Sequence, residues 1–144
     1  MEAPVRAGKI RRWGVSDLDH GDMDQLLRAG GEACVTNQIL YNVTERGAEF
    51  DLLPQLAQRR IPTMAYSPIG QGQLPDSPAL AAVAKRHRAT PFQVAFAWVL
   101  RAPLVIAIPN AGNVAHVTDN RRALELVLTL EDLAGHCQSK CTVR

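Results

Sequence analysis

Short apolar runs alternate with longer amphipathic segments along the chain. The apolar runs at 9–15, 33–40, 61–66 and 104–108 predict four strands. The amphipathic segments predict helices at 19–29, 52–59, 77–88 and 90–101, a helix after 113 that includes 120–128, and a short terminal helix from 129. Strand and helix therefore alternate, which favours parallel strands covered by helices.

Residues that favour helix N-termini precede most of these helices. They are Asp19, Asp51, Ser77, Thr90 and Asn113. The most complete signal is at Thr90, where Pro91 occupies the first helical position and Gln93 completes a capping box.

Two architectures fit this alternation: a doubly wound sheet and part of a β/α barrel. Hydrophobic periodicity does not distinguish them. A complete eight-stranded barrel needs about 250 residues, and the chain has 144. No G-x-G-x-x-G follows the first strand, where Gly14, Val15 and Ser16 lead into Asp17 and Leu18, and this weakens a dinucleotide-binding sheet.

Composition narrows the class of protein further. Hydrophobic residues make up 47% of the chain and charged residues 21%, which is typical of a globular domain. The net charge of +2 is small and the arginine pairs are scattered, so we expect no nucleic-acid binding. No apolar run reaches the roughly 20 residues of a membrane span, and no secretory signal opens the chain, so we expect a cytoplasmic protein.

Cysteine and histidine give no strong sign of a metal site. Cys34 lies in an apolar run, and Cys137 and Cys141 have only His136 as a further nearby ligand, so we expect free thiols. We expect His20, His87 and His136 to face solvent, and Trp13 and Trp98 to serve packing.

Polar and aromatic side chains gather where the predicted strands end. The carboxyl ends of parallel strands are where sites form in α/β proteins. The residues concerned are Ser16, Asp17, Asn37, Gln38, Tyr66, Ser67, Pro109 and Asn110. Individually they fit ordinary roles as turn residues, a buried amide or a half-buried aromatic, but four successive strands deliver them to one rim.

Five stretches resemble successive landmarks of bacterial aldo-keto reductases, in the right order and spacing. They are GKIRRWGVSD (8–17), TNQILYN (36–42), AYSPIGQG (65–72), TPFQVAFAWVL (90–100) and IPNAGN (108–113). The resemblance covers about 3–133 and matches strands five to eight of the family's (β/α)8 TIM barrel. It implies an α/β half-barrel of about four C-terminal β/α units, with 1–144 a single partial NADP-dependent oxidoreductase domain. Independently of the resemblance, we expect the terminal residues 138–144 to form a frayed tail.

The resemblance implies that this half mainly holds NADPH. Ser16 and Gln38 would bind the nicotinamide carboxamide, and the Tyr66 ring would stack on the nicotinamide. The turn of Ser67, Pro68, Ile69 and Gly70 would line the pyrophosphate through its backbone. The adenosine 2′-phosphate and adenine would be held by Ile108, Pro109, Asn110, His116 and Asn120.

Three positions depart from the family pattern. Asp17 stands where Asn is usual, and a carboxylate accepts hydrogen bonds but cannot donate them. Asn110 stands where Lys is common, and His116 where Arg is common. We therefore expect NADP as cofactor with a preference relaxed toward NAD, unless Arg121 or Arg122 compensates.

The family's catalytic Asp, Tyr, Lys and His lie on or after the first four strands, and no part of this chain matches that region. We therefore assign no catalytic residue, expect this chain alone to be inactive, and expect a truncated gene product or gene model. A carbonyl substrate would bind only with the missing half, and open sheet edges predict self-association. A catalytically inactive barrel fragment acting as an interaction module, and an unrelated α/β binding domain, remain the alternatives.

Overall fold

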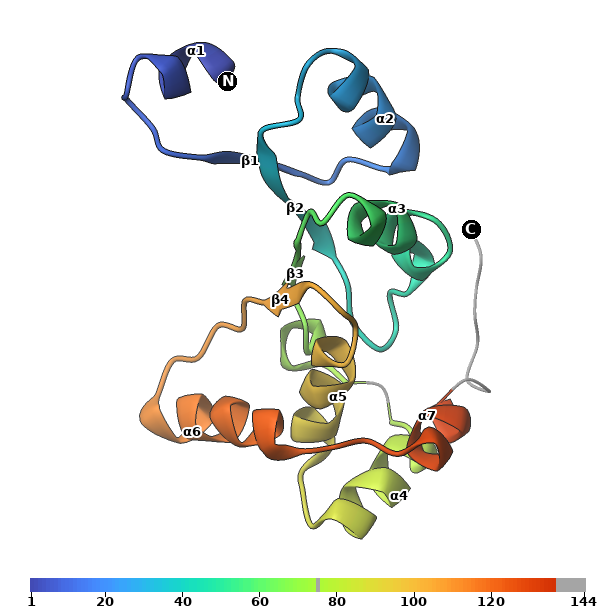
Figure 1. The fold of residues 1–144 in the computed structure, drawn as a ribbon. Helices are drawn as coiled ribbons and strands as arrows, with labels where there is room; N and C mark the ends of the chain where they lie inside the picture. Colours follow the sequence, from blue (N-terminus) through green and yellow to red (C-terminus); the bar gives the residue numbers. More distant parts are fainter. Residues whose placement is uncertain (75, 137–144) are drawn as a thin grey trace.

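A computed structural model describes residues 1–74 and 76–136 (Figure 1). The tail predicted at 138–144 and the two cysteines Cys137 and Cys141 lie outside the described residues, and the side chain of His136 lies outside the described part as well.

The four strands form one parallel sheet, and they follow one another across it in chain order. They are β1 (Trp13–Ser16), β2 (Cys34–Leu40), β3 (Thr63–Tyr66) and β4 (Val105–Ala107). Crossovers between parallel strands are almost always right-handed, and in this strand order each one advances in the same direction, which places the connecting helices on one face, as in a barrel wall. A doubly wound sheet reverses its strand order, so this topology favours the barrel segment.

The edge strand β1 is shorter than the run predicted at 9–15. Its pairing with β2 begins at Trp13, which lies opposite Cys34, and β2 itself starts there. Residues before Trp13 have no neighbouring strand and so do not enter the ladder.

Seven α-helices and three short 3-10 helices are present in the described residues. The α-helices are α1 (Glu2–Arg6), α2 (His20–Arg28), α3 (Leu52–Gln58), α4 (Pro78–His87), α5 (Pro91–Leu100), α6 (Val114–Arg122) and α7 (Leu130–His136). The 3-10 helices are η1 (Gly47–Glu49), η2 (Gly70–Gly72) and η3 (Ala123–Glu125). None of the helices in this part of the chain has the length and apolar character of a membrane span.

Helix starts follow the predicted caps, and at Asp51 only the side-chain hydrogen bond is missing. Capping boxes are present at Asp19 and Thr90, whereas the Asp51 side chain makes no capping hydrogen bond. Asp51 is the N-cap residue as predicted, but Pro54 occupies the third helical position and has no N–H to donate to its side chain. The helix predicted through 128 also ends earlier, at Arg122, because the chain tightens into η3 and then becomes extended at Leu126.

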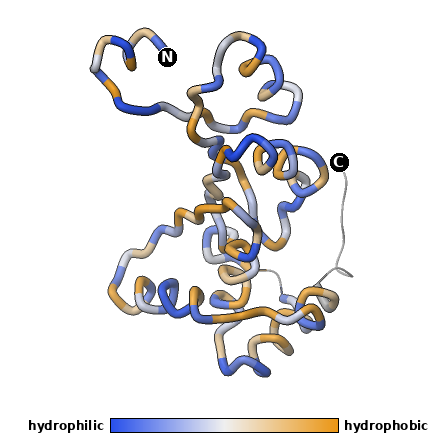
Figure 2. Tube along the Cα trace, viewed as in Figure 1, coloured by the Kyte–Doolittle hydropathy of each residue, from blue (hydrophilic) through white to orange (hydrophobic). Residues whose placement is uncertain are grey.

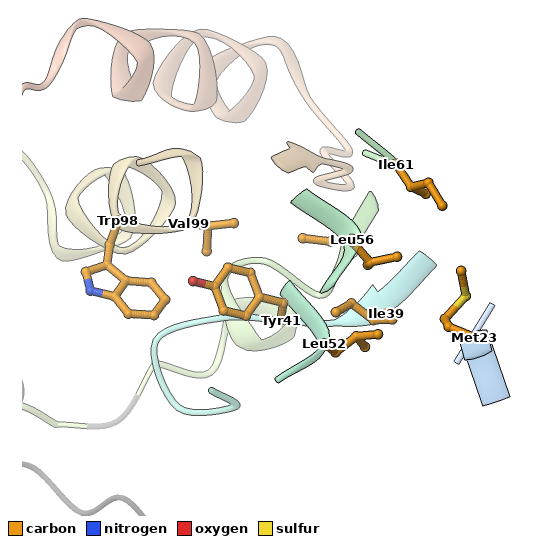
Figure 3. Close-up of a cluster of buried hydrophobic side chains, with 9 residues drawn as sticks. Met23, Ile39, Tyr41, Leu52, Leu56, Ile61, Trp98 and Val99 are labelled. Atoms are coloured by element: carbon orange, nitrogen blue, oxygen red, sulfur yellow. The ribbon is translucent and has the colours of Figure 1, made fainter. Parts of the chain in front are cut away.

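The main hydrophobic core lies between the sheet and helices α2, α3 and α5. Figure 3 shows it extending from Met23 of α2, past Ile39 and Tyr41, to Trp98 of α5. A second cluster joins α4 to α5 and includes Leu80, Val83, Ala84, Val94 and Ala95. The packing roles predicted for Trp13 and Trp98 are confirmed, since both are buried.

Helix α5 is the central helix of the described chain. Its residues from Gln93 to Val99 are all buried, because α5 packs against β4, α4, α6 and η3. The outer helices α2 and α6 carry hydrophilic positions instead, and a hydrophobic stretch connects α6 to α7 (Figure 2).

The location of His87 differs from the one predicted from the sequence. It was expected to face solvent, but its Nε2 lies 2.8 Å from Oδ2 of Asp132, whose side chain is 2% exposed. Arg86 and the Thr129 backbone N–H also donate to this carboxylate. Asp132 therefore fastens α7 onto the end of α4.

The sheet face that lies away from the main hydrophobic core is not covered by helices of the described chain. Strand pairing places Ser16 beside Gln38, Gln38 beside Met64, and Met64 beside Ile106 in one row across this face. Ile106 is 48% exposed and Leu40 is 39% exposed. In a closed barrel this face would be the interior.

Candidate functional site

The carboxyl edge of the open face brings together three of the predicted cofactor residues. Ser16 ends β1 and pairs with Gln38 of β2. Leu40, two residues beyond Gln38 and hence on the same face, pairs with Tyr66 at the end of β3. Ser16, Gln38 and Tyr66 therefore lie at one edge of one sheet face, as the sequence predicts.

Asp17 follows β1 and turns the chain out of the sheet. Its φ of 55° lies in the left-handed region, which aspartate tolerates better than most residues. The Asp17 backbone N–H donates to the Gln38 carbonyl at 2.8 Å. The Ser16 hydroxyl lies 3.2 Å from the same carbonyl and 3.3 Å from Oδ2 of Asp17, so the ends of β1 and β2 are tied together at the site.

Tyr66 and Asp17 interact across this edge. Burial and hydrogen bonding to the Asp17 carboxylate raise the pKa of the Tyr66 hydroxyl above its ordinary value, and the negative charge of Asp17 acts in the same direction. The Tyr66 side chain is half-buried, so part of it remains accessible from the open face.

The predicted phosphate turn begins directly after Tyr66. Ser67 has a φ of 48° and Gly70 a φ of 58°, so the chain reverses within a few residues. Pro68 has no N–H, and the Gly70 N–H already donates to the Ser67 carbonyl at 3.0 Å. Ser67 and Ile69 are therefore the turn's remaining candidates to donate a backbone N–H to a phosphate.

Asn42 braces this turn, a role that the sequence reasoning missed. Its side chain is 3% exposed, and its Nδ2 donates to the Ser67 carbonyl at 3.1 Å. Its Oδ1 accepts from the backbone N–H groups of Thr44 and Glu45 and from the Thr44 hydroxyl. The signal was present in the sequence, since Asn42 closes the 36–42 stretch right after a strand, where asparagine commonly binds nearby backbone.

The residues predicted to bind the adenosine end of the cofactor begin directly after β4. The Ile108 N–H donates to the Ala65 carbonyl at 3.1 Å, so the start of this segment lies beside the end of β3. Ile108 and Asn110 are exposed, and Pro109 is half-buried. The turn at 67–70 and the segment at 108–110, which are predicted to bind the cofactor phosphates, therefore leave the sheet from adjacent strands.

His116 and Asn120 lie on α6, which follows this segment. His116 is exposed in the first turn, where its backbone N–H donates to Oδ1 of Asn113 at 2.9 Å, and Asn120 is half-buried. Arg121 and Arg122 form exposed ion pairs at 3.6 Å with Glu125 and at 3.9 Å with Asp119. Exposed pairs of this kind contribute little stability.

A cavity of about 530 Å³ opens at the carboxyl edge beside Asp17. Its walls come from the β1–α2 loop, the end of β2, η1 and the start of α3, and they include Leu18, Leu40, Ala48 and Leu52. Of the predicted cofactor residues, Asp17 lines this cavity, whereas Ser16, Gln38 and Tyr66 do not.

The η1 wall of this cavity is held by a charged network. Glu49 accepts from the Tyr41 hydroxyl and from Arg101, each at 2.7 Å, and from Arg46 at 2.8 Å. Arg101 also stacks 3.6 Å above the Trp98 ring. Burial and the hydrogen bond to Glu49 raise the pKa of Tyr41 to about 12, so this hydroxyl remains a donor at neutral pH.

Residues 1–74 and 76–136 contain no group of three or more His, Cys, Asp or Glu side chains placed to hold a metal ion. Cys34 is buried and free, and its thiol lies 3.4 Å from the Thr36 carbonyl.

Known proteins resemble this chain over nearly its whole length. The model of the "Aldo/keto reductase family" matches residues 1–136. Methylglyoxal reductase YeaE of Escherichia coli is 44% identical over 140 residues, which cover 93% of this chain and 49% of that protein.

Solved structures agree with the sequence comparison. An aldo/keto reductase from Klebsiella pneumoniae in complex with NADP and acetate superimposes with a TM-score of 0.88 at 47% identity, covering 94% of this chain and 50% of the other. A Klebsiella pneumoniae aldo-keto reductase in complex with NADPH gives a TM-score of 0.86 at 48% identity, with the same coverage. The chain spans about half the length of these relatives, which confirms the predicted half-barrel.

Proposed function

The chain belongs to the aldo/keto reductase family of oxidoreductases, and from this membership we propose that it forms the NADP(H)-binding half of a reductase that converts aldehydes or ketones to alcohols by hydride transfer. The observation that carries the proposal is the position of Ser16, Gln38 and Tyr66 on one open face at the carboxyl edge of the sheet. Carboxyl edges are where parallel α/β folds place their ligands.

The residues at this edge fit a nicotinamide. The Gln38 amide and the Ser16 hydroxyl together offer donors and acceptors that match a carboxamide. The half-buried Tyr66 ring offers a flat surface for a flat cofactor ring. Bound there, the nicotinamide would supply the hydride, while these side chains would fix its position and present one face.

The segments next to this edge fit the rest of the cofactor. Backbone N–H groups of Ser67 and Ile69 would meet the pyrophosphate, with Asn42 holding the turn in place. Ile108, Pro109, Asn110, His116 and Asn120 would meet the adenosine end. The bound NADP and NADPH of the Klebsiella neighbours support NADP as cofactor, and the neutral Asn110 supports a preference relaxed toward NAD.

Catalysis needs groups that this chain does not contain. The resemblance places the family's proton donor and its partners before the matched region, so residues 1–144 alone should show no carbonyl reduction with NADPH above background. Steady turnover by a clean preparation would contradict this part of the proposal. The relatives named above are reductases, which gives no support to an interaction module.

The proposal includes a cytoplasmic location. Its support is the free thiol of Cys34, which suits a reducing compartment, and the proposed use of a soluble nicotinamide cofactor.

The test is an NADPH titration of the chain, followed by the fluorescence of the reduced nicotinamide. Gln38→Ala should weaken binding by roughly three- to tenfold, the effect of about one hydrogen bond, and Tyr66→Ala should weaken it by a similar factor through lost stacking. Gln58→Ala on the exposed end of α3 is the matched control and should leave binding unchanged. Equal losses in Gln38→Ala and Gln58→Ala, or no binding by the parent chain, would overturn the proposal.

A further inference from the structure

We propose that Asp17 makes the cofactor site discriminate between the two oxidation states of the nicotinamide, holding the oxidised, positively charged ring more tightly than the neutral, reduced ring. The inference rests on the proposed cofactor site. The preference for the oxidised ring would come from the Asp17 carboxylate, which stands where the family pattern has an amide.

Backbone geometry keeps Asp17 at the nicotinamide end of the site. The residue directly follows β1, and its N–H is bound to the Gln38 carbonyl at 2.8 Å. Its Oδ2 lies 3.3 Å from the Ser16 hydroxyl. Asp17 is thus held by its backbone against Gln38 and by its side chain beside Ser16, two of the three residues that are proposed to hold the nicotinamide.

The surroundings of Asp17 add further negative charge. The cavity beside it is also lined by Asp19, Asp51 and His20, and its described lining contains neither lysine nor arginine. The Asp19 carboxylate accepts from the Asp22 N–H at the start of α2, which fixes its position. No lining cation is therefore placed to neutralise Asp17.

Charge distinguishes the two forms of the cofactor. The oxidised nicotinamide ring carries a positive charge and the reduced ring carries none, whereas the carboxamide is present in both. A carboxylate can accept from the carboxamide N–H in either form, but it attracts the ring itself only in the oxidised form. For unit charges about 5 Å apart and an effective dielectric constant of about 40 to 80, that attraction amounts to roughly four- to fifteenfold in affinity.

The experiment measures the dissociation constants of NADP⁺ and NADPH for the parent chain and for Asp17→Asn. Asparagine has the same shape and also tolerates a φ of 55°, so the variant should keep the fold. The ratio of the NADPH constant to the NADP⁺ constant should fall by roughly four- to fifteenfold in Asp17→Asn. Glu32→Gln, an exposed carboxylate-to-amide change before β2, is the control and should leave the ratio unchanged.

A second measurement needs no nucleotide. NMR of ¹³Cζ-labelled tyrosine, with the two tyrosines assigned by Tyr66→Phe, reports the pKa of the Tyr66 hydroxyl. Asp17→Asn should lower this pKa, because the neighbouring negative charge is removed. A lowered pKa together with the fall in the nucleotide ratio supports the proposal.

The outcomes separate the two claims. If the parent chain binds neither nucleotide, the proposed function fails and this inference fails with it. If both nucleotides bind and Asp17→Asn leaves their ratio unchanged, the cofactor site stands and the role of Asp17 is overturned, whatever happens to Tyr66. If Glu32→Gln changes the ratio as much as Asp17→Asn does, the effect comes from net charge and the role of Asp17 is likewise overturned.

Discussion

Asn42→Ala is the substitution whose effect follows most directly from the structure. The Asn42 side chain is buried between the end of β2 and the turn after β3, and it makes four hydrogen bonds. One of these holds the Ser67 carbonyl, and the other three hold the backbone at Thr44 and Glu45 and the Thr44 hydroxyl. Alanine removes all of them, and the Ser67 carbonyl then keeps only the bond from the Gly70 N–H within the turn itself.

The cost can be worked out from these contacts. A hydrogen bond contributes about 0.5 to 1.5 kcal/mol net, but water can replace the bonds to Thr44 and Glu45, which are exposed. The Ser67 carbonyl keeps the Gly70 N–H as a donor, so we expect Asn42→Ala to lower the free energy of unfolding by about 1 to 2 kcal/mol, the net value of one or two hydrogen bonds. This is a large share of the roughly 5 to 15 kcal/mol that stabilises a typical domain.

Urea unfolding followed by circular dichroism, at a fixed protein concentration, measures this change. Thr44→Val is the graded control, because it removes only one of the four bonds and should cost less than about 1 kcal/mol. Under conditions where both proteins are folded, Asn42→Ala should also weaken NADPH binding more than Thr44→Val does. A loss below about 0.5 kcal/mol in Asn42→Ala, or NADPH binding equal to that of the parent chain, would refute the bracing role.

Three further predictions concern assembly, cofactor preference and acid stability. The open edges of β1 and β4 should make the chain self-associate, so light scattering at low micromolar concentration should give a mass above 15.7 kDa; a compact monomer with cooperative melting would contradict this. Asn110→Lys and His116→Arg should each raise the preference for NADPH over NADH by roughly tenfold, measured as dissociation constants at pH 7.5. The assignment of these positions to the phosphate pocket would be wrong if the parent chain already preferred NADPH a thousandfold at pH 7.5 and neither substitution increased that preference. Burial would raise the pKa of Asp132, but hydrogen bonds from Arg86 and Thr129 outweigh burial and hold it below its usual value. The ionised Asp132 carboxylate therefore stabilises the folded protein at pH values above its unfolded pKa near 4, and this stabilisation is lost as the pH falls through the folded pKa. Asp132→Asn should destabilise the chain at pH 7 and flatten its loss of stability in acid. Equal acid profiles of the two proteins would exclude this role.

Local signals in the sequence predicted much of the fold. The cap at Asp19 and the capping box at Thr90 depend only on residues three positions apart, and both are present in the structure. The strand runs likewise depend on local alternation and apolar content, although their ends shift where no neighbouring strand is available, as before Trp13. The missing side-chain bond at Asp51 also has a local cause, since Pro54 in the first turn removes one of the N–H groups that could donate to it.

Contacts between distant residues were beyond local signals. His87 meets Asp132, 45 residues away, and Asn42 meets Ser67, 25 residues away. The choice between a doubly wound sheet and a barrel wall also needed the spatial order of the strands, which periodicity does not contain. Ser16, Gln38 and Tyr66 could be placed together beforehand only because parallel strands align their carboxyl ends and the resemblance gave each residue a role.

The central claim is that the carboxyl edge of the open sheet face binds the nicotinamide, and a crystal structure of the chain with NADPH tests it most directly. The account predicts the nicotinamide ring against Tyr66, with its carboxamide within hydrogen-bonding distance of Ser16 and Gln38. A nucleotide bound on the helix-covered side of the sheet, or one that leaves Tyr66 and Gln38 without contact, would contradict it.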